Sequence, residues 1–474
     1  LEACASRLDH FDSGKGLQVE GRVVVLVDGV DEAACRKRWL ELIRRADVIS
    51  SIYSRISFVF SSRPFSGIDK REELGSVEVR RLHSDGDVRV EDLMGDYFSA
   101  FGISLSPASP VRSFIRTPLE LKLFCVLNEG KDLGLGADLP TNVVGLVAAR
   151  LDGLEQEAAD KYGASIDAQP VHKVLAVCAE HLSRSRYAVY DEIASEASLK
   201  FLVIDGLLEK VLGLLVECEA LSRFTRQDGP LEPAEALYAR GIQTFLDYMS
   251  AWRIVESVDD YRNDVFPVGL SGNLEALVFA SVVIFNRTGY IATDNESFKE
   301  LVLPVSDVLE FNCRVLSYVD LENAASASGR ILSWMAHGST ALISVVNGLI
   351  CKVARVKGHP LGPLLLDRYL RSFKKAAARD AVWSLPSNLL ELCRHEGIID
   401  ESNLRLSKED GAAGMPLVVA WHTSSLDSER RELCENLLAG WAVCCPESFV
   451  DLFERMADSS DPQIRESLFA VAAV

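Results

Sequence analysis

The sequence predicts an α/β segment followed by a long all-α region, and three observations lead to this fold class. Two short apolar runs, residues 22–27 (RVVVLV) and Ile56–Phe60 (ISFVF), enclose one helical segment near the start of the chain. From residue 90 onward, the apolar residues recur almost wholly with helical spacing. Hydrophobic residues make up 48% of the 474 residues and charged residues 25%, which excludes a disordered, collagenous or coiled-coil chain.

The first 90 residues alternate between strands and a helix. Residues 22–27 are dominated by a β-branched run, typical of a strand buried on both faces of a parallel sheet. The helical segment that follows has an apolar side formed by Trp39, Leu40, Ile43 and Ala46. Ile56–Phe60 is a second short strand, and residues 77–82 (VEVRRL) alternate as a third, more exposed one. Such a βαβ crossover binds ligands at the carboxyl ends of its strands, which here are Asp28 and residues 61–63.

The remainder of the chain is expected to be helical. Residues 90–101 (VEDLMGDYFSAF) are amphipathic, and Thr117-Pro118 opens another helix, because Pro is tolerated in the first turn. Residues 141–255 are expected to form several helices. Asp461-Pro462 opens the last helix with Asp as its N-cap. Residues 430–474 have the two-helices-and-a-turn cadence of an α-solenoid.

Charge and hydropathy exclude several classes of partner. The formal net charge is −19, so nonspecific binding to nucleic acid or to an anionic membrane is not expected. Residues 371–379 (RSFKKAAAR) are expected to be a solvated basic helix face rather than a nucleic-acid site. The longest apolar runs, such as residues 276–285, span about ten residues, whereas a membrane-spanning helix needs roughly 20.

Cysteine and histidine usage gives no sign of a disulfide framework or of a metal site. The 11 cysteines are scattered and contain no C-x-x-C pair, which is typical of the reduced thiols of a cytoplasmic protein. His172 and His181 lie nine residues apart, which is not a metal-ligand spacing.

The strongest chemical signal is residues 23–33 (VVVLVDGVDEA). An apolar strand leads directly into Asp28, and Asp31 and Glu32 follow. Phosphoryl transfer needs one carboxylate that holds Mg²⁺ and another that orients or deprotonates water. The alternative is that Asp-Gly is an ordinary turn and that Asp-Glu supplies anions at the start of the next helix.

A second signal follows the second strand. Residues 58–64 (FVFSSRP) place hydroxyl groups, among them Ser62, and then Arg63 after the strand. An arginine beside the first site can reach a γ-phosphate and report its presence. The alternative is a surface arginine before the turn-forming Pro64. Because the two strands are expected to be neighbours, both ends are expected to face one crevice.

These segments resemble those of STAND NTPases of the NACHT type. DGVDEA looks like their Walker B segment and FSSRP like their sensor 1 segment. Residues 116–121 (RTPLEL) are similar to the Gly-x-Pro motif of the helical lid, with Arg116 at the usual Gly. Residues 237–251 (LYARGIQTFLDYMSA) resemble a winged-helix segment, with Ala239 at the usual His. Residues 461–465 (DPQIR) are similar to a stretch common in HEAT helices.

The resemblance implies four regions. These are a partial P-loop NTPase core with the C-terminal part of its sheet in residues 1–90, a helical lid and winged-helix-like region in 91–255, a helical linker in 256–425 and the start of a HEAT-like solenoid in 426–474.

The resemblance also implies a site for ATP and Mg²⁺. In that site, Asp28 would bind Mg²⁺, and Asp31 and Glu32 would place or activate water. Arg63, beside Ser62, would sense the γ-phosphate, and Pro118 would pack near the adenine. The phosphate-binding loop G-x-x-x-x-G-K-[ST] does not occur in the sequence. We expect this loop to lie upstream of Leu1, and we expect residues 1–474 alone to bind ATP weakly or not at all and to be inactive as an ATPase.

The expected function is a nucleotide-dependent signalling switch. ATP binding or hydrolysis would drive a conformational change and homo-oligomerisation when the C-terminal helices recognise a protein ligand. Bacterial members of the superfamily act in antiviral defence, where that ligand is a viral protein, and residues 379–384 (RDAVWS) resemble such chains. The alternatives are a non-enzymatic helical scaffold with a degenerate NTPase remnant and a DNA-handling AAA+-like motor, which the acidic composition disfavours.

Overall fold

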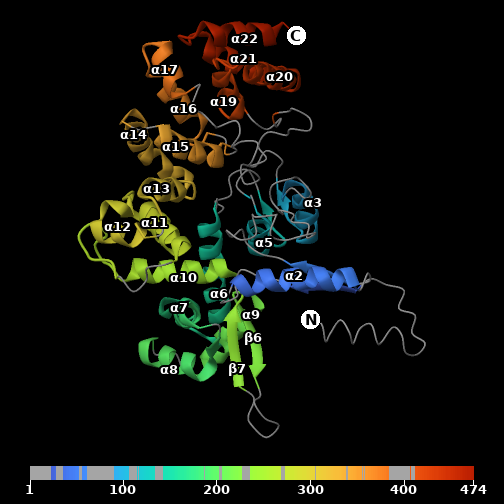
Figure 1. Ribbon diagram of the computed structural model, residues 1–474. Coiled ribbons are helices and arrows are strands. Elements are labelled where there is room, and N and C mark those ends of the chain that lie inside the picture. The colour runs from blue at the N-terminus through green and yellow to red at the C-terminus, as the bar shows by residue number, and fades with distance from the viewer. Residues whose placement is uncertain are drawn as a thin grey trace. The chain divides into compact units, whose positions relative to one another are not determined.

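The computed structural model of the chain (Figure 1) divides into two compact units, Leu1–Asp87 and Val88–Val474. Helices account for most of the described residues and the sheets are small, which confirms the predicted mixture of α/β and all-α structure. No complete P-loop sheet is present among these residues. The residues that the structure describes are 23–27, 36–52, 56–60, 90–105, 115, 117–133, 142–185, 187–201, 205–226, 235–267, 273–304, 306–337, 340–354, 356, 358–383, 406 and 411–473.

The first unit contains a parallel pair of strands and one helix. β1 (Val23–Val27) pairs with β2 (Ile56–Phe60) in parallel, and α2 (Arg36–Ile52) connects them. The helix packs on the strands through Ile49, which is buried together with Ile56 and contacts half-buried Val25 and Phe58. The predicted strand–helix–strand crossover is therefore confirmed. The third strand expected at residues 77–82 lies outside the described residues.

The second unit begins with three helices and a minimal sheet. The short strands pair in parallel with each other, and the middle helix packs on both of the other helices. The elements are α3 (Val90–Ala100), β3 (Ser104–Leu105), α5 (Pro118–Leu127), β4 (Asp132–Leu133) and α6 (Val143–Tyr162). The helix starts predicted near residue 90 and at Pro118 are both confirmed.

A three-stranded antiparallel sheet with helices on its flank follows. The strand order is β5-β7-β6, so the last strand in sequence lies in the middle. The elements are η3 (Ile166–Ala168), α7 (Pro170–Arg184), β5 (Ala188–Val189), α8 (Tyr190–Phe201), α9 (Asp205–Glu217), β6 (Leu221–Arg226) and β7 (Glu235–Arg240). The several helices expected for residues 141–255 are present, and three short strands lie among them. Periodicity did not reveal these strands, because strands of two and six residues are too short to be distinguished by it and form only by pairing with one another.

The rest of the second unit is helical. The helices are α10 (Gln243–Glu256), α11 (Leu274–Thr288), η5 (Ala292–Asp294), α12 (Glu296–Val302), α13 (Val308–Leu316), α14 (Leu321–His337), α15 (Thr340–Val353), α16 (Pro363–Arg371), α17 (Ala376–Val382), α19 (Met415–His422), α20 (Ser428–Cys444), α21 (Pro446–Ala457) and α22 (Pro462–Ala472). Helices near in sequence pack on each other, as α10 does on α11, α16 on α19 and α20 on α22. Figure 1 shows them succeeding one another toward the C-terminus. This arrangement is compatible with a helical solenoid.

Candidate functional site

The carboxyl ends of β1 and β2 lie side by side. Val27 and Phe60 are register partners at the last position of each strand. Asp28 follows Val27 directly, and Ser61 follows Phe60 directly. The segments that carry the predicted site therefore leave the same edge of the strand pair, as expected for a ligand crevice of a parallel sheet. The predicted site residues of these segments, Asp28, Asp31, Glu32, Ser62 and Arg63, themselves lie outside the described residues.

One face of this strand pair lacks a covering helix among the described residues. α2 covers the face that contains Val25 and Phe58. On the opposite face, the side chains of Val24 and Val59 are 53% and 52% exposed. Parallel sheets are ordinarily covered on both faces.

Pro118 is the single predicted site residue that the structure describes, and it opens α5. Thr117 is the N-cap, and its hydroxyl accepts a hydrogen bond from the Glu120 amide at 3.2 Å. The Glu120 carboxylate accepts one from the Thr117 amide at 2.9 Å. This is a complete capping box, so the Thr-Pro-x-Glu pattern has a local structural cause. Pro118 is exposed.

Pro118 belongs to the second unit, whereas the residues at the strand ends belong to the first. In the part of the chain that the structure describes, no three His, Cys, Asp or Glu side chains lie close enough to hold a metal ion together.

The segment that resembles a winged-helix motif spans β7 and the start of α10. Ala239 lies half-buried on β7 beside Ser222 of β6. Gln243 donates its side-chain amide to Asp247 at 2.8 Å, and Asn273 donates to the same carboxylate oxygen at 2.7 Å. Asp247 is buried, so Gln243 and Asn273 satisfy a carboxylate that would otherwise be costly to bury. Gln243 therefore bonds within α10, and Asn273, the N-cap of α11, joins the start of α11 to α10.

A buried carboxylate–imidazole pair joins α6, α7 and α10. Oε1 of Glu155 accepts hydrogen bonds from the backbone amide and from Nδ1 of His172, each at 2.9 Å. The N-cap of α7, Gln169, has a left-handed φ of 47° and makes no side-chain capping bond. Glu155 therefore caps α7 from a neighbouring helix. Trp252 of α10 packs on the imidazole, with 5.9 Å between the ring centroids.

Sequence spacing did not reveal this pair, because its partners come from different helices. His172 has a structural role as the hydrogen-bond partner of Glu155. Among the described residues, it belongs to no group of side chains that could hold a metal ion. Oε2 of Glu155 is buried without a hydrogen-bond partner in the described part of the chain. A buried water molecule is the ordinary way to satisfy such an atom.

A second buried polar cluster fastens α16 to α19 and α21. Oδ1 of Asp367 accepts from Trp421 Nε1 at 3.0 Å and from Arg371 Nε at 2.9 Å. Oδ2 accepts from Nη2 and Nε of Arg455, at 2.8 and 3.1 Å. Arg371 also donates to Asp458 at 2.7 Å. Each oxygen of the buried Asp367 therefore has two donors, which satisfies a carboxylate removed from water.

The same region corrects the expected solvated basic face. The helix is interrupted between Arg371, the end of α16, and Ala376, the start of α17. Arg371 belongs to the Asp367 cluster, and Arg379 is fully buried in an ion pair with Asp461. Lys374 and Lys375 are exposed as expected. The prediction failed because Arg371 pairs with Asp367 on its own helix and with the distant Asp458, and Arg379 pairs with the distant Asp461.

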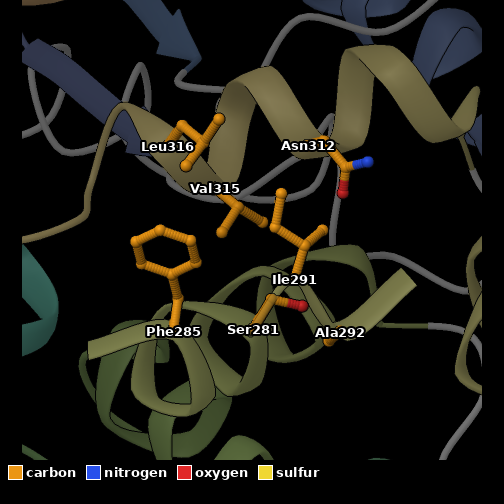
Figure 2. Close-up of a pocket in the computed structure, with 7 residues that line it drawn as sticks. All are labelled: Ser281, Phe285, Ile291, Ala292, Asn312, Val315 and Leu316. Atoms are coloured by element: carbon orange, nitrogen blue, oxygen red, sulfur yellow. The ribbon is translucent and has the colours of Figure 1, made fainter. Parts of the chain in front are cut away.

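A small cavity lies between α11 and α13 (Figure 2). Its lining residues are Ser281, Phe285, Ile291, Ala292, Asn312, Val315 and Leu316. It has room for about one water molecule, far below the roughly 300–1,000 Å³ of a small-molecule site. Oγ of Ser281 is buried without a hydrogen-bond partner among the described residues. The cavity therefore fits a structural water molecule and not a substrate.

Several buried thiols are unsuitable as nucleophiles. Burial raises the pKa of Cys125 to about 11, and it raises the pKa values of Cys178 and Cys313 to about 12. These three thiols stay protonated at neutral pH, and the thiolate is the reactive form.

Comparison with known proteins gives no relative from which a function can be transferred. No protein-family model, curated protein or solved structure matches the chain. In the part of the chain that the structure describes, no helix is both long enough and apolar enough to cross a membrane.

Proposed function

We propose that the chain is part of a nucleotide-dependent signalling switch of the NACHT type of STAND NTPases. The observation that carries the proposal is the parallel pairing of β1 and β2, whose last residues Val27 and Phe60 are partners. The segments DGVDEA and SSRP leave the fold from these neighbouring ends. In this proposal, Asp28 binds Mg²⁺, and Asp31 and Glu32 orient and activate water. Arg63, beside Ser62, contacts the γ-phosphate.

The second unit supports the proposal through its order of elements. A helix, a short strand, two helices and a two-stranded hairpin follow one another from α7 to β7, and the third strand lies between the other two. We assign this arrangement as a winged-helix unit. It follows a helical segment that starts at exposed Pro118, the residue proposed to pack near the adenine. The packed helices from α10 to α22 are proposed to be a linker and the start of a HEAT-like solenoid.

Such a switch works by differential affinity. ATP with Mg²⁺ binds one conformation of the core and lid more tightly than the other, and partner recognition by the C-terminal helices biases that equilibrium. The active state is a homo-oligomer in this proposal, and a viral protein is a candidate ligand if the chain serves in bacterial antiviral defence.

The test compares variants of the protein as its gene encodes it. Asp31→Ala/Glu32→Ala is expected to lower ATP hydrolysis at least 100-fold and to abolish ligand-triggered assembly, because no carboxylate then activates water. The matched control is Glu296→Ala/Glu300→Ala, which removes two exposed carboxylates from α12. Unchanged hydrolysis and assembly in the first variant would overturn the proposal. Residues 1–474 alone are expected to bind Mg-ATP no tighter than millimolar in calorimetry.

The competing proposal is a non-enzymatic helical scaffold with a degenerate NTPase remnant. One observation favours it specifically: the Thr117-Pro118-x-Glu120 pattern is fully explained by a capping box and needs no nucleotide. The scaffold predicts that assembly and partner binding are indifferent to Mg-ATP and to the Asp31/Glu32 substitutions.

A further inference from the structure

The three-stranded sheet has an unpaired edge at β6 (Figure 1). The strand order β5-β7-β6 leaves β6 with β7 as its single neighbour in the described part of the chain. On an edge strand, the backbone amides and carbonyls of alternate residues point away from the sheet. No other described residue donates to this row of β6 groups or accepts from it. The edge therefore presents a row of backbone donors and acceptors that have no partner among the described residues.

β6 lacks several features that keep edge strands from pairing. Such strands are often very short, interrupted by a bulge or a proline, or covered by another element. β6 pairs with β7 over six consecutive residues without a bulge, and its sequence LSRFTR contains no proline. The opposite edge strand, β5, has only two residues. Of the two edges of this sheet, β6 is therefore the one that is long enough to accept a further strand.

An exposed aromatic ring lies on this edge strand. Phe224 and its register partner Leu237 point to the same face of the sheet. The ring of Phe224 meets that of Tyr187 edge to face, with 6.1 Å between the centroids, yet Phe224 remains 51% exposed. Neighbouring side chains on paired strands contact one another. An apolar side chain on a strand added to β6 would therefore cover part of the exposed surface of Phe224.

The charges on β6 itself are positive. The strand contains two arginines and no carboxylate. Arg226 lies opposite Glu235 of β7. Arg223 lies opposite Tyr238, is exposed and forms no ion pair within the described residues. A strand added at this edge therefore meets an arginine whose charge no carboxylate balances.

The flanking elements do not change this local charge. Burial raises the pKa of Tyr238, and Arg223 and Glu209 of α9 shift that pKa in opposite directions, but the two charged groups form no ion pair with each other. Glu219, just before β6, is paired with Lys122 of α5 at 2.6 Å. The other charged residues of α9, β6 and β7 balance one another, with Lys210, Arg226 and Arg240 against Asp205, Glu217 and Glu235.

A second copy of β6 does not match this edge. Two β6 strands side by side would bring four arginines together without a carboxylate from either strand, and like charges on paired strands are destabilising. The net charge of −19 opposes self-association further. Arg223 and Phe224 point to opposite faces of the sheet because they are successive residues of a strand. A strand in which acidic and aliphatic residues alternate therefore matches both side chains.

We propose that the edge of β6 binds an extended acidic segment of a partner protein as a fourth strand of the sheet. In this mode of recognition, backbone hydrogen bonds supply affinity and alternate side chains supply specificity. A Glu or Asp of the segment pairs with Arg223, and a neighbouring aliphatic side chain packs on Phe224. This binding site is distinct from the C-terminal helices and needs no nucleotide, so it goes beyond the proposed switch.

The test measures peptide binding to the protein as its gene encodes it, without nucleotide. The probe is a fluorescently labelled eight-residue peptide of alternating Val and Glu, titrated by anisotropy at 150 mM salt. Arg223→Glu is expected to weaken binding at least tenfold, and Phe224→Ser at least threefold. The matched control is Lys374→Glu, which makes the same charge change at an exposed position between α16 and α17 and is expected to alter binding less than twofold. Circular dichroism checks that the variants remain folded.

Backbone pairing has its own arm. One further probe carries N-methyl groups on its Val amides and another carries them on its Glu amides, so that side chains and charge are unchanged. Because alternate amides of an added strand face β6, one of these two probes is expected to lose binding and the other to retain it. A peptide of alternating Val and Lys is expected to bind Arg223→Glu more tightly than Lys374→Glu.

Four results would overturn the proposal. Absence of binding by the Val/Glu probe would mean that the edge of β6 is closed in the whole protein. Equal binding by Arg223→Glu and Lys374→Glu would remove the charge argument, and equal binding of the two methylated probes would remove strand pairing. A dimer in sedimentation that Arg223→Glu dissociates would make a second copy the occupant. Because nucleotide is absent throughout, failure of the nucleotide proposal leaves this test intact.

Discussion

Arg379 and Asp461 form a buried ion pair between two segments that lie 82 residues apart in the chain. Arg379 is also 5.3 Å from the centre of the Trp421 ring, so its charge faces both a carboxylate and an aromatic ring. Asp461 has a second task as N-cap of α22, where it accepts from the Gln463 amide at 2.9 Å. One side chain therefore starts a helix and fastens it to α17.

The substitution Asp461→Asn distinguishes the N-cap role of Asp461 from its ion pair with Arg379. Asn is as good an N-cap as Asp, so the helix start is retained, but the buried Arg379 loses the negative charge of the Asp461 carboxylate. We expect the free energy of unfolding of the C-terminal helices to fall by about 3–5 kcal/mol. Urea titration followed by tryptophan fluorescence measures this change. The control is Glu256→Gln, which breaks a half-exposed pair with Arg287 and is expected to cost less than about 1 kcal/mol. Equal losses of unfolding free energy in the two variants would contradict a special contribution of the buried Arg379–Asp461 pair.

His422 makes the C-terminal helices sensitive to acid. Its ring lies 4.6 Å from that of Trp383, and neither ring nitrogen has a hydrogen-bond partner in the described part of the chain. Burial, with a smaller effect of Arg430, lowers the pKa of His422 to about 3. In the unfolded chain, the pKa returns to about 6.5. Between these values the unfolded state binds more protons, so stability decreases as the pH falls below about 6.5.

The corresponding experiment compares wild type with His422→Leu from pH 7.5 to pH 4.5. The urea midpoint of wild type, followed by the fluorescence of Trp383 and its neighbours, is expected to fall more steeply with acid than that of the variant. Parallel pH profiles would show that protonation of His422 does not contribute to acid unfolding.

At the scale of elements, the turn between β7 and α10 requires glycine at position 241, because there is no room for a Cβ atom. A Cβ on Gly241 would lie 2.0 Å from the carbonyl oxygen of Glu219, a distance at which the backbone must move. Glu219 itself has a left-handed φ of 63° at the turn between α9 and β6. The amide of Ile242 donates to that carbonyl at 2.7 Å. The two turns therefore hold each other in place at the base of the three-stranded sheet.

Gly241→Ala is expected to destabilise this sheet by about 3 kcal/mol or more, as for overpacking in a core. Gly213→Ala, at an exposed position of α9, is the matched change, since a Cβ there meets no atom within 4 Å. It is expected to stabilise the fold by about 0.5–1 kcal/mol through helix propensity. Thermal unfolding by circular dichroism gives both values. The expected result is a loss of stability in Gly241→Ala and a gain in Gly213→Ala. A loss of stability in both variants would contradict the steric explanation for Gly241.

The helix starts were predictable at this scale, because their causes are local. Thr117-Pro118 and Asp461-Pro462 combine a side-chain acceptor with a residue whose φ already suits a first turn. The strands β5, β6 and β7 were not predicted by periodicity. Their pairing joins Ala188 to Tyr238 and Leu221 to Arg240, and contacts between such separated segments leave no local periodicity in the sequence.

At the scale of the whole molecule, the chain divides between Asp87 and Val88. The second unit has an extensive core that runs from Met94 to Val471. We therefore expect residues 88–474 to fold alone. The helical circular dichroism and the thermal midpoint of this fragment are expected to match those of the helical transition in residues 1–474. A fragment that lacks a cooperative transition would show that the first unit is required for the second to fold.

The starts of helices, the β-branched strands and the helix between them were predictable from the sequence alone. These features depend on dihedral preference, capping and periodicity within a few residues. The sequence also placed DGVDEA and SSRP directly after two strands, and the parallel pairing of those strands agrees with that placement. The chemistry of Asp28, Asp31, Glu32 and Arg63 remains a prediction.

Tertiary structure alone decided which charges are internal and which are exposed. Residues 371–379 resemble a solvated basic face in the sequence, yet Arg371 pairs with Asp458 and Arg379 pairs with Asp461, both far along the chain. Glu155 caps a helix to which it does not belong. The reason is physical: the cost of burying a charge depends on a partner whose distance in space is unrelated to its distance in sequence.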